Sequence, residues 1–392
     1  MTLSSISHID ELRDVIAQAV GDGTPLSVFA GGTKSQFGNP TALEHLLDIS
    51  AMQGVIDYEP EELIITMHAA TLLQDVEKIL AERGQMLSFE PPHISHLYGT
   101  ETDGTIGGVI ATNLSGSRRL SAGAARDYLL GFEAVSGRAS KFRSGSKVVK
   151  NVTGYDLSKL MCGSFGTLAI MDEMTLKVLP APETSLSLII GCASLELAAM
   201  AARAAMQTAY EPSATAILPQ SAHPLSGQAA IAVIRLEGVA VSVEDRAGHL
   251  QKILTEFGHP DRLDETSSKA LWADIADCKI LDKSAPQIWR ISTAPTAGPL
   301  LLQRLQDQLD CMGYMDWAGG LLWLSCADEG AHKLIRDHLA KLGGGHATLM
   351  RADEALRQSI SVFEPQPKAL SALNERIQQA FDPNHILNPG RL

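Results

Sequence analysis

The sequence predicts an α+β fold: an N-terminal domain of two small α+β subdomains, followed by a second α+β domain built on an antiparallel sheet. Three observations lead to this prediction. Glycine-rich stretches follow or interrupt apolar runs at residues 30–34, 103–116 and 163–170. Two prolines at residues 179–183 mark a break, because proline does not fit the middle of a sheet. Beyond the break, strand-like and helix-like segments alternate.

The first domain opens with a short helix and strands. Apolar residues at helical spacing, behind two acidic residues, predict a helix over residues 7–20. Strands are expected at residues 26–29 and 62–67, and an amphipathic helix over residues 71–83 ends at Gly84. Dense glycine and proline punctuation from residue 105 to 178 predicts a second subdomain dominated by strands, at residues 107–111, 129–136, 141–142 and 168–179.

The second domain has a regular alternation of elements. It predicts an antiparallel sheet with helices packed on one face. The expected strands are residues 187–191, 214–218, 229–236, 287–292 and 321–325, and the expected helices are residues 195–208, 242–257, 298–311 and 329–342. We therefore divide the chain into a first domain at 1–181, a second at 182–365, and a C-terminal helix and tail at 366–392 that returns to the first domain.

Composition excludes several classes of protein. The 392 residues include 32 basic and 45 acidic ones, a net charge of −13 that argues against a nucleic-acid binder. The five cysteines are far apart and form no CxxC pair, so a zinc site or an iron–sulfur cluster held by this chain is not expected. The first residues lack a secretory signal, and charges interrupt the most apolar stretch, residues 186–209. We expect no transmembrane segment and a cytoplasmic location.

The glycine-rich stretches suggest one long ligand held at several points. Residues 31–34 can present successive backbone N–H groups to an anion, and the Gly107-Gly108 pair lets the backbone approach a ligand closely. Taken singly, the first and third stretches have simpler explanations, a tight turn for the first and a helix C-cap for Gly163 in the third, whereas the second stretch is more specific. Neither a P-loop nor a GxGxxG dinucleotide fingerprint is present.

Together these stretches resemble the FAD-binding domain of the vanillyl-alcohol oxidase family, also called the p-cresol methylhydroxylase (PCMH) type. The family motif TIGGxxATNxSG matches residues 105–116, and KNxTGYDL matches residues 150–157. GSxGTLxI matches residues 163–170, and the closing NPG[RK] matches residues 388–391. The resemblance runs over nearly the whole chain. It implies a two-subdomain PCMH-type FAD-binding domain followed by an α+β cap domain.

The resemblance also implies which residues bind the cofactor. The first loop of the family wraps the pyrophosphate, and the later stretches follow the rest of the nucleotide. The positions that match are Ala30, Gly31, Gly32, Thr33, Lys34, Thr105, Ile106, Gly107, Gly108, Thr112, Asn113, Ser115, Gly116, Arg126, Asp127, Gly163, Ser164, Gly166, Thr167 and Ile170.

Two departures from the wider family matter. Members that attach FAD covalently often carry histidine after the paired glycines, whereas Thr33 stands here, so non-covalent FAD is expected. Catalytic 2-hydroxy-acid dehydrogenases of the family carry a metal-binding GDGN motif, which this chain lacks. We expect no metal, and we interpret His332, His338 and His346 as ordinary surface or core histidines.

Within the family, residues 286–292 and 316–320 resemble the FAD-binding E subunits of bacterial glycolate oxidases. That similarity implies a subunit that helps to oxidise glycolate to glyoxylate, active as part of a complex. The implied partners are a homologous catalytic flavoprotein D subunit and an iron–sulfur F subunit that passes electrons to a quinone-type acceptor. A complex of this kind would place the cytoplasmic chain at the inner face of the membrane.

Oxidation of a 2-hydroxy acid needs a base for the hydroxyl proton and a cation for the carboxylate. Arg290 is the candidate catalytic residue, as the group that holds the carboxylate, although a structural ion pair explains it equally well. Two alternatives stay open at this point. One is a free-standing FAD-dependent D-2-hydroxy-acid dehydrogenase, and the other is a scaffold subunit with little flavin chemistry.

Overall fold

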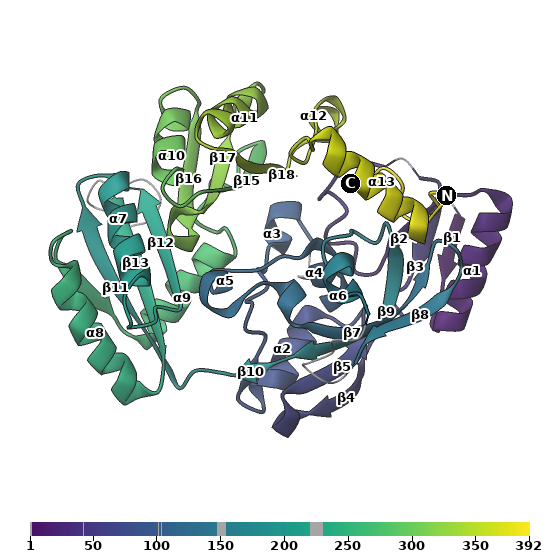
Figure 1. Cartoon of the computed structure of the whole chain (residues 1–392), viewed down its shortest axis with the longest axis horizontal. Helices are drawn as coiled ribbons and strands as arrows, with labels where there is room; N and C mark the ends of the chain where they lie inside the picture. The colour runs from purple at the N-terminus through teal and green to yellow at the C-terminus, as the bar shows by residue number, and fades with distance from the viewer. Residues whose placement is uncertain (1, 42, 101, 103, 147–153, 220–229) are drawn as a thin grey trace.

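The computed structural model describes residues 2–41, 43–100, 102, 104–146, 154–219 and 230–392. Figure 1 shows two lobes side by side, one purple to blue and the other teal to green. The N-terminal lobe holds the strands up to β10 and the C-terminal segment, and the C-terminal lobe holds the strands from β11 to β18. Helices and strands mix in both lobes, which confirms the predicted α+β class.

The N-terminal lobe contains two main sheets. Parallel strands in the order β1-β3-β2 form the first, and antiparallel strands in the order β4-β5-β9-β7-β8 form the second. The strands are β1 (Thr2–Ser5), β2 (Leu26–Phe29), β3 (His45–Asp48), β4 (Val55–Glu59), β5 (Ile64–His68), β6 (Gln85–Met86), β7 (Leu129–Ser136), β8 (Lys141–Gly145), β9 (Ala169–Lys177) and β10 (Leu179–Pro180). The helices are α1 (Ile9–Asp22), α2 (Leu73–Ala81), α3 (Ser95–Tyr98), α4 (Ile106–Thr112), α5 (Arg119–Ala122) and α6 (Leu157–Met161), with short 3₁₀ turns at Pro60–Glu62 and Ala125–Asp127.

The prediction of a strand at residues 107–111 is wrong, because these residues form helix α4. The side chain of Thr105 accepts a hydrogen bond from the N–H of Gly108 and caps the helix at its first turn. Ile106, Val109 and Ile110 then bury one face of the helix in the lobe's core. Paired glycines disfavour a helix, and the β-branched Val109 and Ile110 favour a strand locally. The cap together with tertiary burial outweighed these preferences.

An eight-stranded antiparallel sheet, in the order β14-β11-β13-β12-β16-β17-β15-β18, forms the C-terminal lobe. Its strands are β11 (Thr184–Cys192), β12 (Ala214–Pro219), β13 (Ala230–Gly238), β14 (Pro260–Leu263), β15 (Gln287–Thr293), β16 (Cys311–Asp316), β17 (Leu321–Cys326) and β18 (Gly345–Arg351). Its helices are α7 (Leu195–Met206), α8 (Ala240–Leu254), α9 (Glu265–Ala276), α10 (Gly298–Gln306), α11 (Ala331–Lys341) and α12 (Glu354–Ser359), and a 3₁₀ turn spans Trp317–Gly319.

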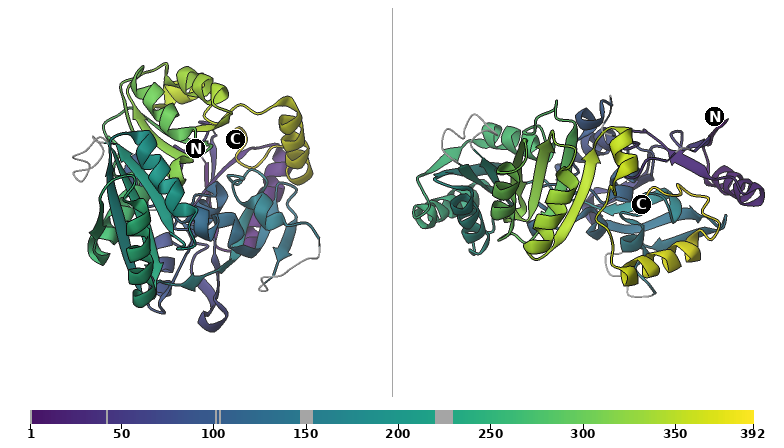
Figure 2. Two further views of the ribbon diagram at one scale, coloured as in Figure 1. Left: turned by 60° about the vertical axis from the view of Figure 1, so that its left-hand side comes forward. Right: turned by 90° about the horizontal axis from the view of Figure 1, so that it is seen from above.

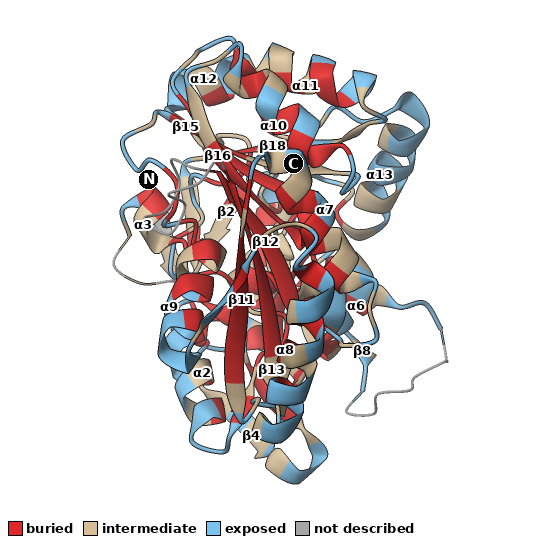
Figure 3. Cartoon of the chain, turned by 90° about the vertical axis from the view of Figure 1, so that its left-hand side faces the viewer, coloured by how far each residue is buried: buried red, intermediate tan, exposed pale blue. Residues whose placement is uncertain are grey.

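Both faces of this sheet are covered, so its central strands are buried, as Figure 3 shows in red for β11 and β13. Leu188 and Ile190 belong to the core shared with α7, α8, α10 and α11, as the sequence predicted. Ile189 points the other way, into a core shared with α9 and with residues of the N-terminal lobe such as Leu97 and Leu114. The sheet is therefore the wall against which the N-terminal lobe packs.

Sequence patterns missed part of this lobe. Helix α9 and strands β14, β16 and β18 were not expected, and the predicted helix at residues 298–311 overran into β16. Helix α9 packs on the face opposite the other helices, with Leu271, Trp272 and Ile275 buried. The expectation of helices on one face is therefore incomplete.

The chain crosses between the lobes at the two prolines. Pro180 lies in β10, which pairs with β6 of the N-terminal lobe, and β11 begins at Thr184. Helix α13 (Lys368–Phe381) returns to the N-terminal lobe, as the yellow helix in Figure 2 shows. The tail then lies beside β2, where the N–H of Leu26 donates to the carbonyl of Ile386 at 2.7 Å. Within the described residues, no helix is both long and apolar enough to cross a bilayer.

Candidate functional site

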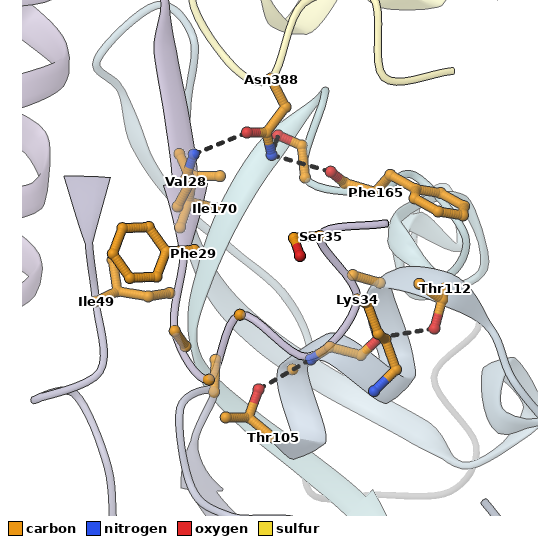
Figure 4. Close-up of a pocket in the computed structure, with 18 of the residues that line it drawn as sticks. Val28, Phe29, Lys34, Ser35, Ile49, Thr105, Thr112, Phe165, Ile170 and Asn388 are labelled. Atoms are coloured by element: carbon orange, nitrogen blue, oxygen red, sulfur yellow. Dashed lines mark hydrogen bonds between the residues drawn. The ribbon is translucent and has the colours of Figure 1, made fainter. Parts of the chain in front are cut away.

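A cavity of about 210 Å³ lies in the N-terminal lobe, where four segments distant in sequence meet. It is bounded by the end of β2 with the loop at residues 30–35, the first turn of α4, the segment around Phe165 to Met171, and the C-terminal tail. Figure 4 shows Phe29, Ile49 and Ile170 on one side and Lys34, Thr105 and Thr112 on another. One wall is therefore apolar and the other polar.

The loop after β2 supplies the polar wall. Within the described structure, the backbone N–H groups of Gly31, Gly32 and Thr33 donate no hydrogen bond. Gly32 has φ of 65°, a left-handed conformation that favours glycine. A side chain on Gly104 would overlap the Thr33 hydroxyl, so the glycine there allows two segments to approach closely. Successive unpaired N–H groups at a cavity form a site for an anion.

Helix α4 contributes its side rather than its N-terminal N–H groups. The N–H groups of Ile106 and Gly107 donate to the carbonyls of Thr71 and Ala69 at 2.9 and 2.8 Å. A Cβ on Gly107 would lie 2.6 Å from the Ala69 carbonyl oxygen, so this glycine is needed for packing. A Cβ on Gly108 would meet nothing closer than 3.5 Å, and Gly108 lines the cavity. The two adjacent glycines therefore have different roles.

Asn388 holds two walls of the cavity together. Its side-chain Oδ1 accepts from the N–H of Val28 at 2.8 Å, and its Nδ2 donates to the carbonyl of Phe165 at 3.0 Å (Figure 4). Asn388 itself has φ of 42°, and Phe165 has φ of 54°. The tail thus fixes the distance between β2 and the third glycine-rich stretch.

Arg391 fixes the first glycine-rich loop from the other side. Its Nη2 donates to the carbonyls of Lys34 and Ser35 at 2.6 and 2.7 Å. Burial, with Arg357 nearby, lowers the pKa of Arg391 to about 10. Because a guanidinium bonded to carbonyls remains a full positive charge near the cavity, it favours an anionic ligand.

About half of the predicted cofactor-binding residues line this cavity. They are Ala30, Gly31, Gly32, Thr33, Lys34, Thr105, Gly107, Gly108, Thr112, Gly166 and Ile170. Sequence reasoning missed lining residues on β2, on β9 and in the tail. Those residues are Ser27, Val28, Phe29, Ser35, Thr41, Ile49, Ala69, Ala111, Phe165, Ala169, Met171, Asn388 and Arg391. The closing NPG[RK] motif was a usable signal for the last two.

The other predicted positions lie outside the lining and have internal partners. Asn113 Oδ1 accepts from the N–H of Arg126, Ser115 Oγ from the N–H of Ala125, and Asp127 Oδ2 from the N–H of Ala124. A further group is buried or packed against neighbouring backbone: Ile106, Gly116, Gly163, Ser164 and Thr167. These residues shape the segment that carries Thr112, and direct contact with a cofactor stays a prediction. Of the KNxTGYDL motif, residues 150–153 lie outside the described residues.

Arg290 lies away from this cavity, at the interface of the lobes. It projects from β15 on the face that meets the N-terminal lobe, and its guanidinium carbon is 5.1 Å from the centroid of Trp317 and 5.9 Å from that of Trp323. Burial, and next the nearby Arg119, lower the pKa of Arg290 to about 10. The structural ion pair considered for Arg290 is absent among the described residues, where its side chain has no hydrogen bond or ion pair.

Next to Arg290 lies a buried carboxyl group. Ser117 Oγ donates to Asp316 Oδ2 at 2.6 Å across the lobe interface, and the N–H of Trp317 donates to Oδ1 at 2.7 Å. Burial raises the pKa of Asp316 to about 6. In the same interface, Arg235 pairs with Glu90 at 2.8 Å and with Glu237 at 3.2 Å.

No metal-binding cluster is found among the described His, Cys, Asp and Glu side chains. Burial lowers the pKa of His332 and of His338 on α11, and His346 lies on β18. The five cysteines are unpaired.

Three comparisons place the chain among known proteins. Residues 5–143 match the family model described as an FAD binding domain. The chain is 32% identical over 398 residues to the glycolate oxidase subunit GlcE of Escherichia coli (strain K12), covering 100% of this chain and 99% of that one. It is 31% identical over 193 residues to the glycolate oxidase subunit GlcD of Bacillus subtilis (strain 168), covering 49% of this chain and 40% of the relative.

The fold also matches a solved structure. p-Cresol methylhydroxylase with substrate bound superposes with a TM-score of 0.73 at 14% identity, covering 99% of this chain and 88% of that one. At that identity the likeness shows the fold alone, and it confirms the PCMH-type architecture expected from the sequence.

Proposed function

The chain belongs to the family of the glycolate oxidase subunit GlcE, and from this membership we propose that it is the FAD-binding subunit of a multi-subunit 2-hydroxy-acid oxidoreductase. In this proposal it takes part in the oxidation of glycolate to glyoxylate. Its partners are a homologous catalytic flavoprotein D subunit and an iron–sulfur F subunit that passes electrons to a quinone-type acceptor. The complex works in the cytoplasm, at the inner face of the membrane.

One observation carries the proposal: in the described part of the chain the backbone N–H groups of Gly31, Gly32 and Thr33 donate no hydrogen bond, and these three residues line a cavity with an opposite apolar wall. This combination suits a dinucleotide, whose phosphates need N–H donors and whose rings need apolar contacts. Lys34 lies on the same wall, and Arg391 adds charge behind it. The residues present therefore fit FAD, with the first glycine-rich loop holding the pyrophosphate. FAD, when bound, supplies the acceptor for the two electrons that the substrate loses.

On the substrate side the chain offers fewer groups. Oxidation of a 2-hydroxy acid removes a hydride from the carbon and a proton from the hydroxyl. Arg290 is proposed to hold the carboxylate, since it is a half-buried cation at the lobe interface without an acidic partner among the described residues. Asp316 already accepts hydrogen bonds from Ser117 Oγ and from the N–H of Trp317, and no metal site accompanies it in the described part of the chain. We therefore assign proton abstraction from glycolate to the D subunit.

Co-purification tests this function. The chain is expressed alone and with its two partner subunits, and flavin content and glycolate-dependent reduction of an artificial acceptor are measured for both. We expect FAD in both preparations, and turnover at least a hundredfold higher in the complex, because a missing base costs orders of magnitude in rate. Full activity of the lone chain would establish a free-standing dehydrogenase. Absence of flavin from the lone chain would establish a scaffold subunit.

A further inference from the structure

Two arginines from different lobes meet on one tryptophan. Arg119, on α5 of the N-terminal lobe, places its guanidinium carbon 4.7 Å from the centroid of Trp317. Arg290, on β15 of the C-terminal lobe, places its own at 5.1 Å from the same centroid. The two guanidinium carbons therefore lie no farther apart than the sum of these distances. Figure 1 shows α5 at the boundary between the lobes, and Ser121 Oγ of the same helix donates to the Ser213 carbonyl of the C-terminal lobe at 2.7 Å.

Neither guanidinium has a hydrogen-bond acceptor among the described residues. Across the described ranges, the side chains of Arg119 and Arg290 donate no hydrogen bond and form no ion pair. Other arginines of this interface differ, because Arg118 pairs with Glu237 at 3.3 Å and Arg235 with Glu90 at 2.8 Å. By contrast, Arg119 and Arg290 lack an anionic partner among the described residues. A guanidinium has five N–H donors, and both of these side chains are only half-buried, so their donors remain available to a ligand that enters between the lobes.

Nearby carboxylates do not supply the missing acceptor. Asp316 accepts from Ser117 and from the Trp317 N–H, and Asp127 accepts from the N–H of Ala124. Burial lowers the pKa of Arg119 as well as that of Arg290. The positive charge of Arg119 further lowers the pKa of Arg290, because the two like charges repel. An anion bound to both would remove the repulsion and satisfy the donors.

We propose that Arg119 and Arg290, over Trp317, form a binding site for a small carboxylate that bridges the two lobes. This inference rests on the proposed function and extends it, because it adds Arg119 of the N-terminal lobe to the carboxylate-holding group. Each guanidinium can bind a carboxylate through two parallel hydrogen bonds. With two arginines present, a small acid carrying two carboxylates binds more tightly than glycolate.

Oxalate is the probe, because it carries two carboxylates and no hydroxyl to oxidise. Isothermal titration calorimetry with the FAD-loaded chain measures the affinity for oxalate. We expect Arg119→Gln and Arg290→Gln each to reduce the affinity for oxalate at least tenfold. We also expect the unsubstituted chain to bind glycolate more weakly than oxalate. Arg262→Gln is the matched control, since Arg262 is an exposed arginine of the C-terminal lobe paired with Glu244. Its affinity for oxalate should be unchanged.

Arg119→Gln carries the test even if Arg290→Gln fails to fold, because Arg119 lies on the short helix α5, whereas Arg290 lies on β15 between two paired strands. The melting temperature of Arg119→Gln is compared with that of the control variant. Unchanged oxalate affinity in Arg119→Gln, or no oxalate binding to the unsubstituted chain, overturns the site. Oxalate binding that depends on both arginines, in a chain whose complex does not oxidise glycolate, supports the site and refutes the proposed function. If the complex oxidises glycolate but the affinity for oxalate does not depend on Arg119, the proposed function is supported and the two-arginine site is refuted.

Discussion

The side-chain oxygen of Asn388 accepts a hydrogen bond from the backbone N–H of Val28 at 2.8 Å, across 360 residues of sequence. The same amide donates to the carbonyl of Phe165, so one side chain joins β2 to the third glycine-rich stretch. Because both partners are backbone groups, the bond depends on the position of the tail rather than on the side chains of the cavity. The tail therefore determines the shape of the cavity.

Asn388→Asp should weaken FAD binding. The carboxylate keeps an acceptor for Val28 but loses the donor to Phe165 and places a negative charge beside that carbonyl. We expect a loss of about 1–3 kcal/mol in unfolding free energy, the usual cost of an unsatisfied buried polar group, and a clear rise in the dissociation constant of FAD. Flavin fluorescence during dialysis measures the second effect. Asn384→Asp is the control: it lies four residues away and is exposed, and normal FAD binding by Asn388→Asp would argue against this role of the tail.

Gly108→Trp and Gly107→Ala should separate cofactor loss from loss of the fold. Gly108 faces the cavity, so an indole there occupies ligand space and flavin content should fall close to zero with the melting temperature little changed. Gly107→Ala places a methyl 2.6 Å from the Ala69 carbonyl and should destabilise the chain by about 1–3 kcal/mol through overpacking.

Gly32→Trp is a less clear probe than Gly108→Trp. Space is open around Gly32, but its φ of 65° adds backbone strain to any side chain. If Gly108→Trp retains normal flavin, the cavity is not the cofactor site.

FAD should be bound without a covalent bond, because Thr33 stands where a histidine linkage occurs in relatives and its side chain is buried against Gly104. Acid precipitation should release all of the flavin into the supernatant, where its absorbance is measured against the total. Yellow colour retained by the washed pellet would contradict the prediction.

Asp316 should make the chain less stable as pH rises from about 4 to 6. Its folded pKa of about 6 lies above the ordinary value of 3.8, so the folded state holds a proton that the unfolded chain releases in this window. Its contribution to the free energy of unfolding falls there by at most about 1.4 kcal/mol per pH unit and then levels off. Asp316→Asn removes the titration, so urea unfolding of both proteins at several pH values isolates the effect.

Asp282→Asn is the control with the opposite sign. Hydrogen bonds from Ser284 lower the pKa of this exposed carboxyl, so its contribution to stability is lost as pH falls. An identical pH dependence in the unsubstituted chain and in Asp316→Asn would show that this carboxyl is not buried as described.

Local patterns in the sequence determined most of the elements and the first part of the site. Strands such as β2 and β13 and helices such as α1 and α7 follow from their apolar periodicity, because each element buries one face or both. The glycine-rich stretches indicated where the cavity lies, since some of their glycines have a positive φ or allow two segments to approach closely, as Gly32 and Gly104 do. The order of these stretches was enough to indicate the PCMH-type fold.

Only the tertiary structure decided what depends on distant partners. Residues 106–112 are helical because Thr105 caps the helix and because Ile106, Val109 and Ile110 are buried in the core. The local sequence does not indicate either effect, since its β-branched residues favour a strand. Asn388 bonds to β2 and Arg391 to the loop after it, both more than 350 residues away. Arg119 and Arg290 lie against the same Trp317 only because the two lobes pack together. A sequence pattern records which residues can be buried or can bind, but the folded chain decides which of them come within reach of one another.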